Sequence, residues 1–217
     1  KSRTLTLKVI DSLKLNYSYF VKENIKELEI YKNTPLFLEF TPLKINKSEI
    51  FTFNIENISN TGFQLSINDE QLGDYTFDST IKSKFGDLKI VTNINYIPNV
   101  KSKNNHHKEI MVKYQPSFSL AENYRSQTNI SPTSKTSSVL NLTLNSNVPE
   151  KTADYLNTLV SFYNLQGIVD KRFISQHTSD FISNRLNIIA EELGDVEKDV
   201  EGYKNSNSLT DIQTEVK

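Results

Sequence analysis

The sequence predicts an α+β fold: a largely antiparallel sheet base with flanking short helices and long C-terminal coiled-coil-like helices. Two observations predict it. Alternating apolar and polar residues, the pattern of half-buried strands, occur between residues 36 and 145. From residue 149 onward, apolar residues instead recur at intervals of three and four, the pattern of helices. Runs of strands followed by runs of helices favour α+β over α/β.

The chain opens with a predicted helix. In "SRTLTLKVIDSLKL", Leu5 and Val9 belong to an apolar series with a spacing of four, Ser2 is suited to cap the helix, and Asn16 to end it. The following "YSYFVKENIKELEIYKNTP" has a mixed pattern, and we assign it no element.

A block of strands is predicted next. Two alternating runs, 51–55 and 63–67, flank the turn-forming "NISNTG" and predict a β-hairpin, whose phenylalanines we expect in the core. The polar segment "IPNVKSKNNHHKE" predicts a loop. Further strands are indicated by Leu36, Leu38 and Phe40, by Leu88 and Ile90, and by Ile110, Val112 and Tyr114.

Helical sequence dominates the remainder of the chain. A short helix is predicted from Ser117 ("SFSLAENYRSQ"), then a strand in "SVLNLTLNSN" with Leu140, Leu142 and Leu144 on one face. "NVPE" is a helix-start signature, and only helical pattern follows from Asp170 to about Asn205. We therefore divide the chain into a base, 1–148, and a long helical extension, 149–217. The first extension helix, 149–166, has Ala153, Leu156, Val160 and Tyr163 as its predicted apolar face.

A narrow apolar stripe distinguishes the C-terminal helix, and we call it the seam. It runs roughly 30 Å at about 1.5 Å per residue, too narrow a stripe to cover a globular core. Sustained intervals of four and three are typical of a coiled coil, and the alternative is one helix of a compact bundle. Gly194 interrupts the pattern at a cost of about 1 kcal/mol relative to alanine, which favours a partner helix. The seam consists of Ile182, Leu186, Ile189, Leu193, Val196, Val200 and Tyr203.

The partner of the seam is not evident in the sequence. The 149–166 helix could supply part of it, and the sequence stops at "SLTDIQTEVK", where a returning helix would begin. We therefore expect a helix outside this fragment or one from a neighbouring subunit. The outer faces are acidic and solvated, with Glu191, Glu192, Asp195, Glu197, Asp199 and Glu201 against Lys198 and Lys204.

Composition excludes several classes of protein. The net charge of −1 gives no basic excess for a phosphate backbone, so we expect no nucleic-acid partner. The chain contains no cysteine, which excludes disulfides, thiolate metal sites and cysteine catalysis. No run reaches the roughly 20 apolar residues that span a bilayer, and no signal peptide opens the chain, which begins at Lys1 without methionine. We interpret the chain as an excised fragment whose membrane or export signals, if any, lie outside it.

Several segments, in their order along the chain, resemble the polysaccharide co-polymerases, also called chain-length determinant or Wzz-type proteins. "VLNLTLNSNVPEKTADYLNTLVSFYN" is similar to the family's strand, proline, Lys-x-Ala and helix with Asn-x-Leu-Val and an aromatic residue. "SDFISNRLNIIAEELGDVEKDVEGYKNSN" resembles its later helix, and "SRTLTLKVIDSLKLNYSY" resembles the segment after its first membrane helix. "VKENIKELEIYKNTPLFLEF" resembles members fused to a tyrosine autokinase (Wzc-like), as in Bacteroidota-like bacteria. The matching motif positions are Pro149, Lys151, Ala153, Asn157, Leu159, Val160 and Tyr163.

The resemblance implies a function. Such proteins lie in the bacterial inner membrane with a large periplasmic domain, form rings or bells, and set the length of capsular, exopolysaccharide or O-antigen chains. It therefore implies a periplasmic, non-catalytic scaffold, a homo-oligomer that meets polymerase or export proteins and polysaccharide, anchored through segments outside this fragment. The stretch from Leu36 to Lys108 departs from compact members by its additional hairpins, and no phosphate-binding Gly-rich loop is present for a kinase activity.

No catalytic, cofactor-binding or metal-binding residue is assigned from the sequence. His106 and His107 form a poor metal cage with Glu109 alone, and His177 lacks a serine–acid pair. We interpret the acidic residues as a solvated hairpin end and the Asn-x-Ser/Thr sites as chance in an asparagine-rich chain. These are Asp69, Glu70 and Asp74, and Asn16, Asn57 and Asn141.

Two other functions stay open. One is a carbohydrate- or protein-binding β domain with a helical stalk, for which the exposed tyrosines would stack on sugar rings. The other is a hydrolase that uses the acidic turn, which no constellation of residues supports.

Overall fold

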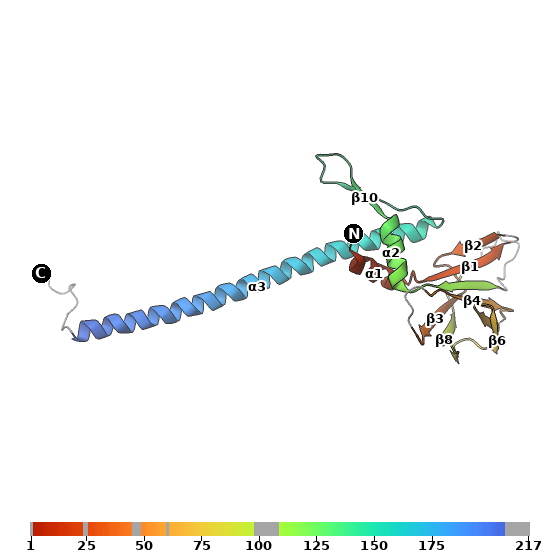
Figure 1. The fold of residues 1–217 in the computed structure, drawn as a ribbon, viewed down its shortest axis with the longest axis horizontal. Coiled ribbons are helices and arrows are strands. Elements are labelled where there is room, and N and C mark those ends of the chain that lie inside the picture. The colour runs from red at the N-terminus through yellow and green to blue at the C-terminus, as the bar shows by residue number, and fades with distance from the viewer. Residues whose placement is uncertain (1, 24–25, 45–48, 60, 98–108, 207–217) are drawn as a thin grey trace. The chain divides into compact units, whose positions relative to one another are not determined.

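The computed structural model describes residues 2–23, 26–44, 49–59, 61–97 and 109–206. These residues form an α+β fold of antiparallel sheets and three helices, and the predicted fold class is confirmed (Figure 1). Contacts divide the chain into two compact units, Lys1–Tyr163 and Asn164–Lys217. The division predicted from sequence lies earlier, between residues 148 and 149.

Three helices and eleven strands are described. The helices are α1 (Arg3–Ser12), α2 (Ser117–Gln127) and α3 (Pro149–Ser206). The strands are β1 (Tyr17–Glu23), β2 (Lys26–Ile30), β3 (Leu36–Pro42), β4 (Phe51–Glu56), β5 (Phe63–Ile67), β6 (Glu70–Tyr75), β7 (Thr80–Lys82), β8 (Gly86–Thr92), β9 (Ile110–Tyr114), β10 (Asn129–Pro132) and β11 (Leu140–Thr143).

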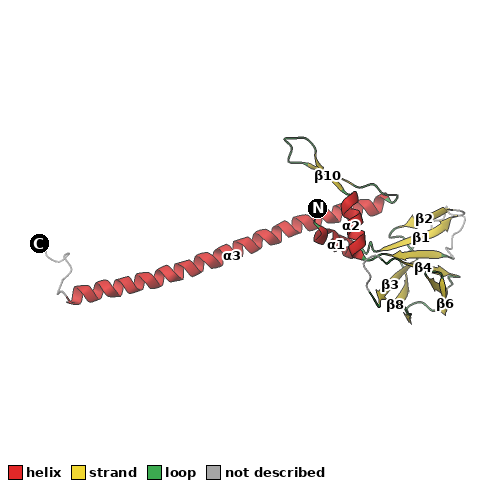
Figure 2. Ribbon diagram, viewed as in Figure 1, coloured by secondary structure: helices red, strands yellow, loops and turns green. Residues whose placement is uncertain are grey.

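Two antiparallel sheets share one apolar core in the first unit. The larger has the order β2-β1-β9-β4-β5-β6 and the smaller the order β3-β8-β7; Figure 2 shows their strands gathered together. The predicted hairpin is β4–β5, with Phe53 paired to Ile67. Its phenylalanines Phe51, Phe53 and Phe63 are buried, as predicted. They pack with inward residues of the smaller sheet, such as Leu38 and Ile90.

Two tyrosine hydroxyls join the sheets through the backbone of β3, an outer strand of the smaller sheet. The Tyr17 hydroxyl accepts from the Phe40 N–H at 3.1 Å and donates to the Phe40 carbonyl at 3.3 Å. The Leu38 N–H donates to the Tyr19 hydroxyl at 3.1 Å. These bonds satisfy backbone groups that an outer strand would otherwise leave unpaired.

A second apolar cluster forms between the helices. Val9 and Ile10 of α1, Ala121 of α2 and Tyr155 of α3 are buried in it, together with Leu15. Ser2 caps α1 by accepting from the Leu5 N–H at 3.4 Å, as predicted. The helix ends at Ser12 rather than at Asn16, because Lys14 takes a positive φ of 50° and turns the chain into β1.

The segment assigned no element is in fact a hairpin, β1–β2. Tyr19 pairs with Ile30 on β2 and with Val112 on β9, so β1 lies inside the larger sheet. Phe20 breaks the expected alternation because it faces outward, where the Lys113 ammonium lies 4.8 Å from its ring centre. The strands β1 and β2 were therefore not predicted from the sequence.

Three further short strands escaped prediction: β6, β7 and β10. Glu70 begins β6 and pairs with Ile67 at the exposed end of the β5–β6 hairpin, as predicted, but Asp74 lies farther along β6, paired with Gln64, so the interpretation as a hairpin end is wrong for Asp74. Asp69 does lie in the turn, with a φ of 66°. β6 is an outer strand with largely exposed residues, which explains its weak apolar pattern.

The helical extension is one continuous helix, α3, rather than two. Its packed face also differs from the prediction. Of the predicted face, Leu156 is half-buried and packs against the helical cluster, but Ala153, Val160 and Tyr163 are exposed. The buried residues are Lys151, Thr152 and Tyr155. The predicted face follows the apolar pattern, but the buried face includes a lysine whose charge is paired by the sheet.

Candidate functional site

The seam is an exposed apolar stripe of α3. All seven of its side chains are between 48% and 64% exposed, so none of them is buried within the described part of the chain. A helix in a folded protein gains most of its stability from packing of its apolar face, and about half of each seam side chain stays in water here. The seam therefore has the character of an interaction site for another helix.

Polar contacts on α3 run along the helix itself. Lys198 Nζ lies 3.4 Å from Asp195 Oδ1, and Gln176 donates to Asp180 at 3.0 Å. Pairs at such spacings contribute a few tenths of a kcal/mol to a solvated helix. These four residues lie outside the seam.

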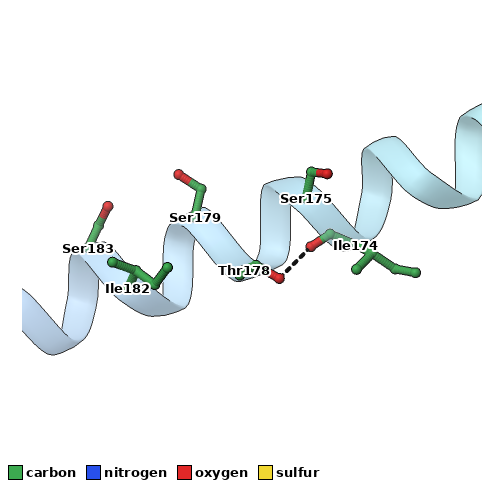
Figure 3. Close-up of a pocket in the computed structure, with 6 residues that line it drawn as sticks. All are labelled: Ile174, Ser175, Thr178, Ser179, Ile182 and Ser183. Atoms are coloured by element: carbon green, nitrogen blue, oxygen red, sulfur yellow. Dashed lines mark hydrogen bonds between the residues drawn. The ribbon is translucent and has the colours of Figure 1, made fainter.

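The four-and-three spacing continues beyond Ile182 toward the N-terminus with small residues. Ser179 and Ser175 occupy the next two positions, in a shallow surface hollow on the one helix, which Figure 3 shows with Ile174, Thr178, Ile182 and Ser183. Thr178 donates its hydroxyl to the Ile174 carbonyl at 2.9 Å. The seam predicted from the sequence begins at Ile182 and does not include these serines, because they are not apolar. Small side chains at such positions allow a closer approach of a neighbouring backbone than large ones do.

The first turns of α3 are fastened to the larger sheet by a buried ion pair. Lys151 Nζ lies 2.6 Å from Glu29 Oε1 on β2 and donates to Ser18 Oγ on β1 at 2.9 Å. The side chains of Lys151 and Glu29 are only 10% and 22% exposed. Both partners are hydrogen-bonded, which offsets the cost of their desolvation. Lys151 is one of the positions that carries the resemblance described above.

One turn later, a second ion pair joins α3 to the segment after β2. Lys32 Nζ lies 2.5 Å from Asp154 Oδ2. The hydrogen bond from Lys32 holds the pKa of Asp154 below its usual range, with a further contribution from Tyr31. Burial, together with the bond to Asp154, raises the pKa of the Tyr31 hydroxyl. Sequence analysis missed both pairs, because their partners lie far apart in the chain.

An open polar groove lies on the larger sheet at the β4–β5 and β5–β6 hairpins. Asn57 donates to Gln64 Oε1 at 3.0 Å, and Gln64 is paired in register with Asp74 on β6. The half-buried Tyr75 follows Asp74. Amides, hydroxyls, a carboxylate and an aromatic residue are the groups that recognise sugars. The groove is lined by Asn57, Ser59, Thr61, Gly62, Phe63, Gln64, Asp74, Tyr75, Thr76 and Ser79.

The remaining candidates are dispersed. His106 and His107 lie outside the described residues. His177 is exposed on α3, with its ring centre 4.1 Å from that of Phe173. Within the described ranges, no three His, Asp or Glu side chains gather closely enough to hold a metal ion. Of the Asn-x-Ser/Thr sites, Asn141 is exposed on β11, Asn57 bonds Gln64, and Asn16 is half-buried beside Tyr114.

No helix in the described part of the chain combines the length and the apolarity that a bilayer crossing requires. Comparison with protein-family models gives no match, and comparison with curated proteins gives none.

Proposed function

We propose that this chain is a non-catalytic scaffold domain that regulates the length or export of a capsular polysaccharide or exopolysaccharide by oligomerising around the polymerase or export machinery. In this proposal it is the periplasmic portion of a bacterial inner-membrane protein. The observation that carries the proposal is the exposed seam of α3, from Ile182 to Tyr203. The order of motifs that resembles the polysaccharide co-polymerases supplies the biological context.

The proposed mechanism is geometric. A helix that leaves about half of each seam side chain in water gains free energy when another helix covers it, at roughly 25 cal/mol per Å² of apolar surface buried. Repetition of that contact around a ring would hold several copies at fixed separations. The Lys151–Glu29 and Lys32–Asp154 pairs would then hold the start of α3 at a fixed position on the larger sheet. Polymerases bound to such a ring would be held at fixed distances from one another.

The test is the polysaccharide itself, in the native cell. Ile189→Asp with Leu193→Asp places two charges on the seam, and Asn184→Asp with Asn187→Asp places two on the outer face of the same helix. We expect the seam variant to lose the modal chain length on a polysaccharide gel, and the outer-face variant to keep it. Equal abundance of both proteins by immunoblot is the control. An unchanged length distribution in the seam variant contradicts the proposal.

A second candidate function is carbohydrate binding by the sheet body, favoured by the polar groove beside Tyr75. Titration calorimetry of the 217-residue chain with the cell's own polysaccharide fragments tests it. Binding that is lost in Gln64→Ala with Asp74→Ala, and retained in Ser66→Ala, supports this function. Absence of binding heat excludes it at the concentrations used.

A further inference from the structure

The ribbon formed by β10 and β11 is a sheet of its own. Within the described residues, β11 pairs with β10 alone, from Asn129 opposite Thr143 to Pro132 opposite Leu140. Figure 2 shows the ribbon extending away from α2. Its side chains are largely exposed, including Leu140 at 58% and Ile130 at 38%. A two-stranded ribbon is marginally stable by itself, so a further strand along its edge would stabilise it.

The other outer strands of the described sheets each carry a feature that opposes pairing with another chain. β2 and β6 carry charged residues, β7 has three residues, and two N–H groups of β3 are bonded by Tyr17 and Tyr19. β10 contains Pro132, which has no N–H to donate. β11 has the sequence Leu-Asn-Leu-Thr and contains neither a charge nor a proline. The outer edge of β11 is therefore suited to accept another strand.

The pairing of β11 with β10 decides which of its backbone groups face outward. The Thr133 N–H donates to the Val139 carbonyl at 3.0 Å, so these two residues form a hydrogen-bonded pair. Bonded and non-bonded pairs alternate along an antiparallel ladder, which places Leu140 and Leu142 at non-bonded positions. Their N–H and carbonyl groups point away from β10. Each copy of the chain thus has two donors and two acceptors at this edge.

We propose that β11 pairs antiparallel with β11 of a second copy of this chain, with Asn141 opposite its own equivalent. In this register Leu140 exchanges hydrogen bonds with the partner's Leu142, and Leu142 with the partner's Leu140, so all four outward donors are matched. The pleat places leucine beside leucine on one face and asparagine beside asparagine on the other. A shift of one residue would set Asn141 opposite a leucine and bring outward groups against groups already bonded to β10.

The two-fold arrangement also ends the assembly at two copies. The combined sheet has the order β10-β11-β11-β10, and each of its outer strands is a β10 that contains Pro132. The match of all four donors favours a second copy over an unrelated strand, because one sequence supplies both sides. Four residues on each side make a small interface, so we expect a weak, reversible dimer. The inference stands on the ribbon alone and does not rest on the proposed function of the seam.

Introduced cysteines report the register directly, because the chain contains no cysteine. Asn141→Cys places two thiols at a non-bonded pair, with Cα atoms about 4.5 Å apart, within the range of a disulfide. Val139→Cys and Thr143→Cys, when mixed, bring together the next such pair. On mild oxidation we expect a covalent dimer from Asn141→Cys and from the mixture, and none from Ser131→Cys on β10. Equal cross-linking of Asn141→Cys and Ser131→Cys overturns the proposal, as does an Asn141→Cys chain that does not cross-link.

Sedimentation equilibrium gives the second readout. Leu142→Pro removes an outward N–H of β11 without breaking a bond to β10, and Ile130→Pro makes the same change on the outer edge of β10. Loss of two hydrogen bonds per dimer should raise the dissociation constant about tenfold or more for Leu142→Pro. Ile130→Pro should leave the dissociation constant unchanged. Circular dichroism confirms that each variant is folded.

Contacts through the seam are removed from both experiments. Every 217-residue chain also carries the two substitutions of the seam variant, so failure of the seam proposal and failure of this one are distinguishable. Equal dissociation constants for the two proline variants overturn the pairing of β11. A chain that stays monomeric at the highest concentration overturns it too, and so does a dimer whose Asn141→Cys variant stays reduced, because its contact lies elsewhere.

Discussion

The ammonium of Lys151 lies 2.6 Å from the Glu29 carboxylate, joining the first turn of α3 to the second strand across 122 residues of sequence. The bond fixes where the long helix begins relative to the larger sheet. It also places a lysine on the buried face of the helix, which differs from the apolar face predicted from the sequence. An ion pair, as well as apolar packing, therefore fixes the position of the first turn of α3.

Removal of one partner should therefore destabilise the first unit. Lys151→Met leaves the Glu29 carboxylate half-buried and unpaired, and we expect a loss of about 2 kcal/mol in the free energy of unfolding. Urea denaturation followed by circular dichroism measures it. Lys198→Met, which breaks the exposed pair with Asp195, should cost less than about 0.5 kcal/mol. Equal effects of the two substitutions would contradict a structural role for the buried pair.

The hydroxyl of Tyr17 should matter to the sheets beyond its ring. Tyr17→Phe keeps the aromatic packing and leaves the Phe40 N–H and carbonyl without their partner, so we expect a loss of about 1 to 2 kcal/mol. Tyr163→Phe, on the exposed side of α3, should change the unfolding free energy by less than about 0.5 kcal/mol. A neutral Tyr17→Phe would show that water replaces the hydroxyl at the edge of β3.

Asp154 gives the first unit an acid-sensitive contribution to stability. The bond from Lys32 lowers its folded pKa below the ordinary value of 3.8, so the stabilisation is fully present above about pH 3.8 and is lost as the pH falls through the lowered pKa. Asp154→Asn should therefore destabilise most near neutral pH and progressively less in acid. Urea denaturation of both chains between about pH 7 and about pH 2 measures the difference. A difference that is constant with pH would contradict this assignment.

Two glycines should respond oppositely to the same substitution. Gly86 has a φ of 151°, and an added Cβ would clash with the Thr41 carbonyl oxygen, so Gly86→Ala should cost about 2 kcal/mol or more. Gly194 lies within α3 with no atom near an added Cβ, so Gly194→Ala should stabilise the helix by about 1 kcal/mol. Thermal unfolding followed by circular dichroism distinguishes them. A shift in the same direction for both would be inconsistent with these backbone roles.

The sequence predicted the strands in which burial of one face alone decides where the apolar residues stand. β4, β5, β8 and β9 each have one buried and one wetter face, so apolar alternation alone identified them. β1 escaped because an outward phenylalanine, Phe20, is covered by a lysine from another strand. The packed face of α3 escaped because Lys151 is buried only through Glu29, a partner that no local pattern reveals.

Part of the candidate site was also predicted from the sequence, because local periodicity reveals the seam. The seam is a local, periodic feature, and its exposure in the structure agrees with a stripe that its own chain does not cover. The exposed isoleucines Ile94 and Ile97 lie in a loop that is bonded to Asn33, and this bond joins residues 64 apart in sequence. Two isoleucines in polar sequence carry no periodic signal, so this feature required the fold.

The most direct test of the seam is its accessibility in the cell, because the chain contains no cysteine and each introduced thiol is alone. Single cysteines at Leu186, Ile189, Leu193 and Val196, and at the outer positions Asn184, Asn187, Glu191 and Lys198, are labelled with a maleimide in native cells and in the purified 217-residue chain. We predict that all eight react in the purified chain and that only the four seam cysteines are protected in cells. Equal labelling of seam and outer positions in cells would contradict the claim that another helix covers the seam.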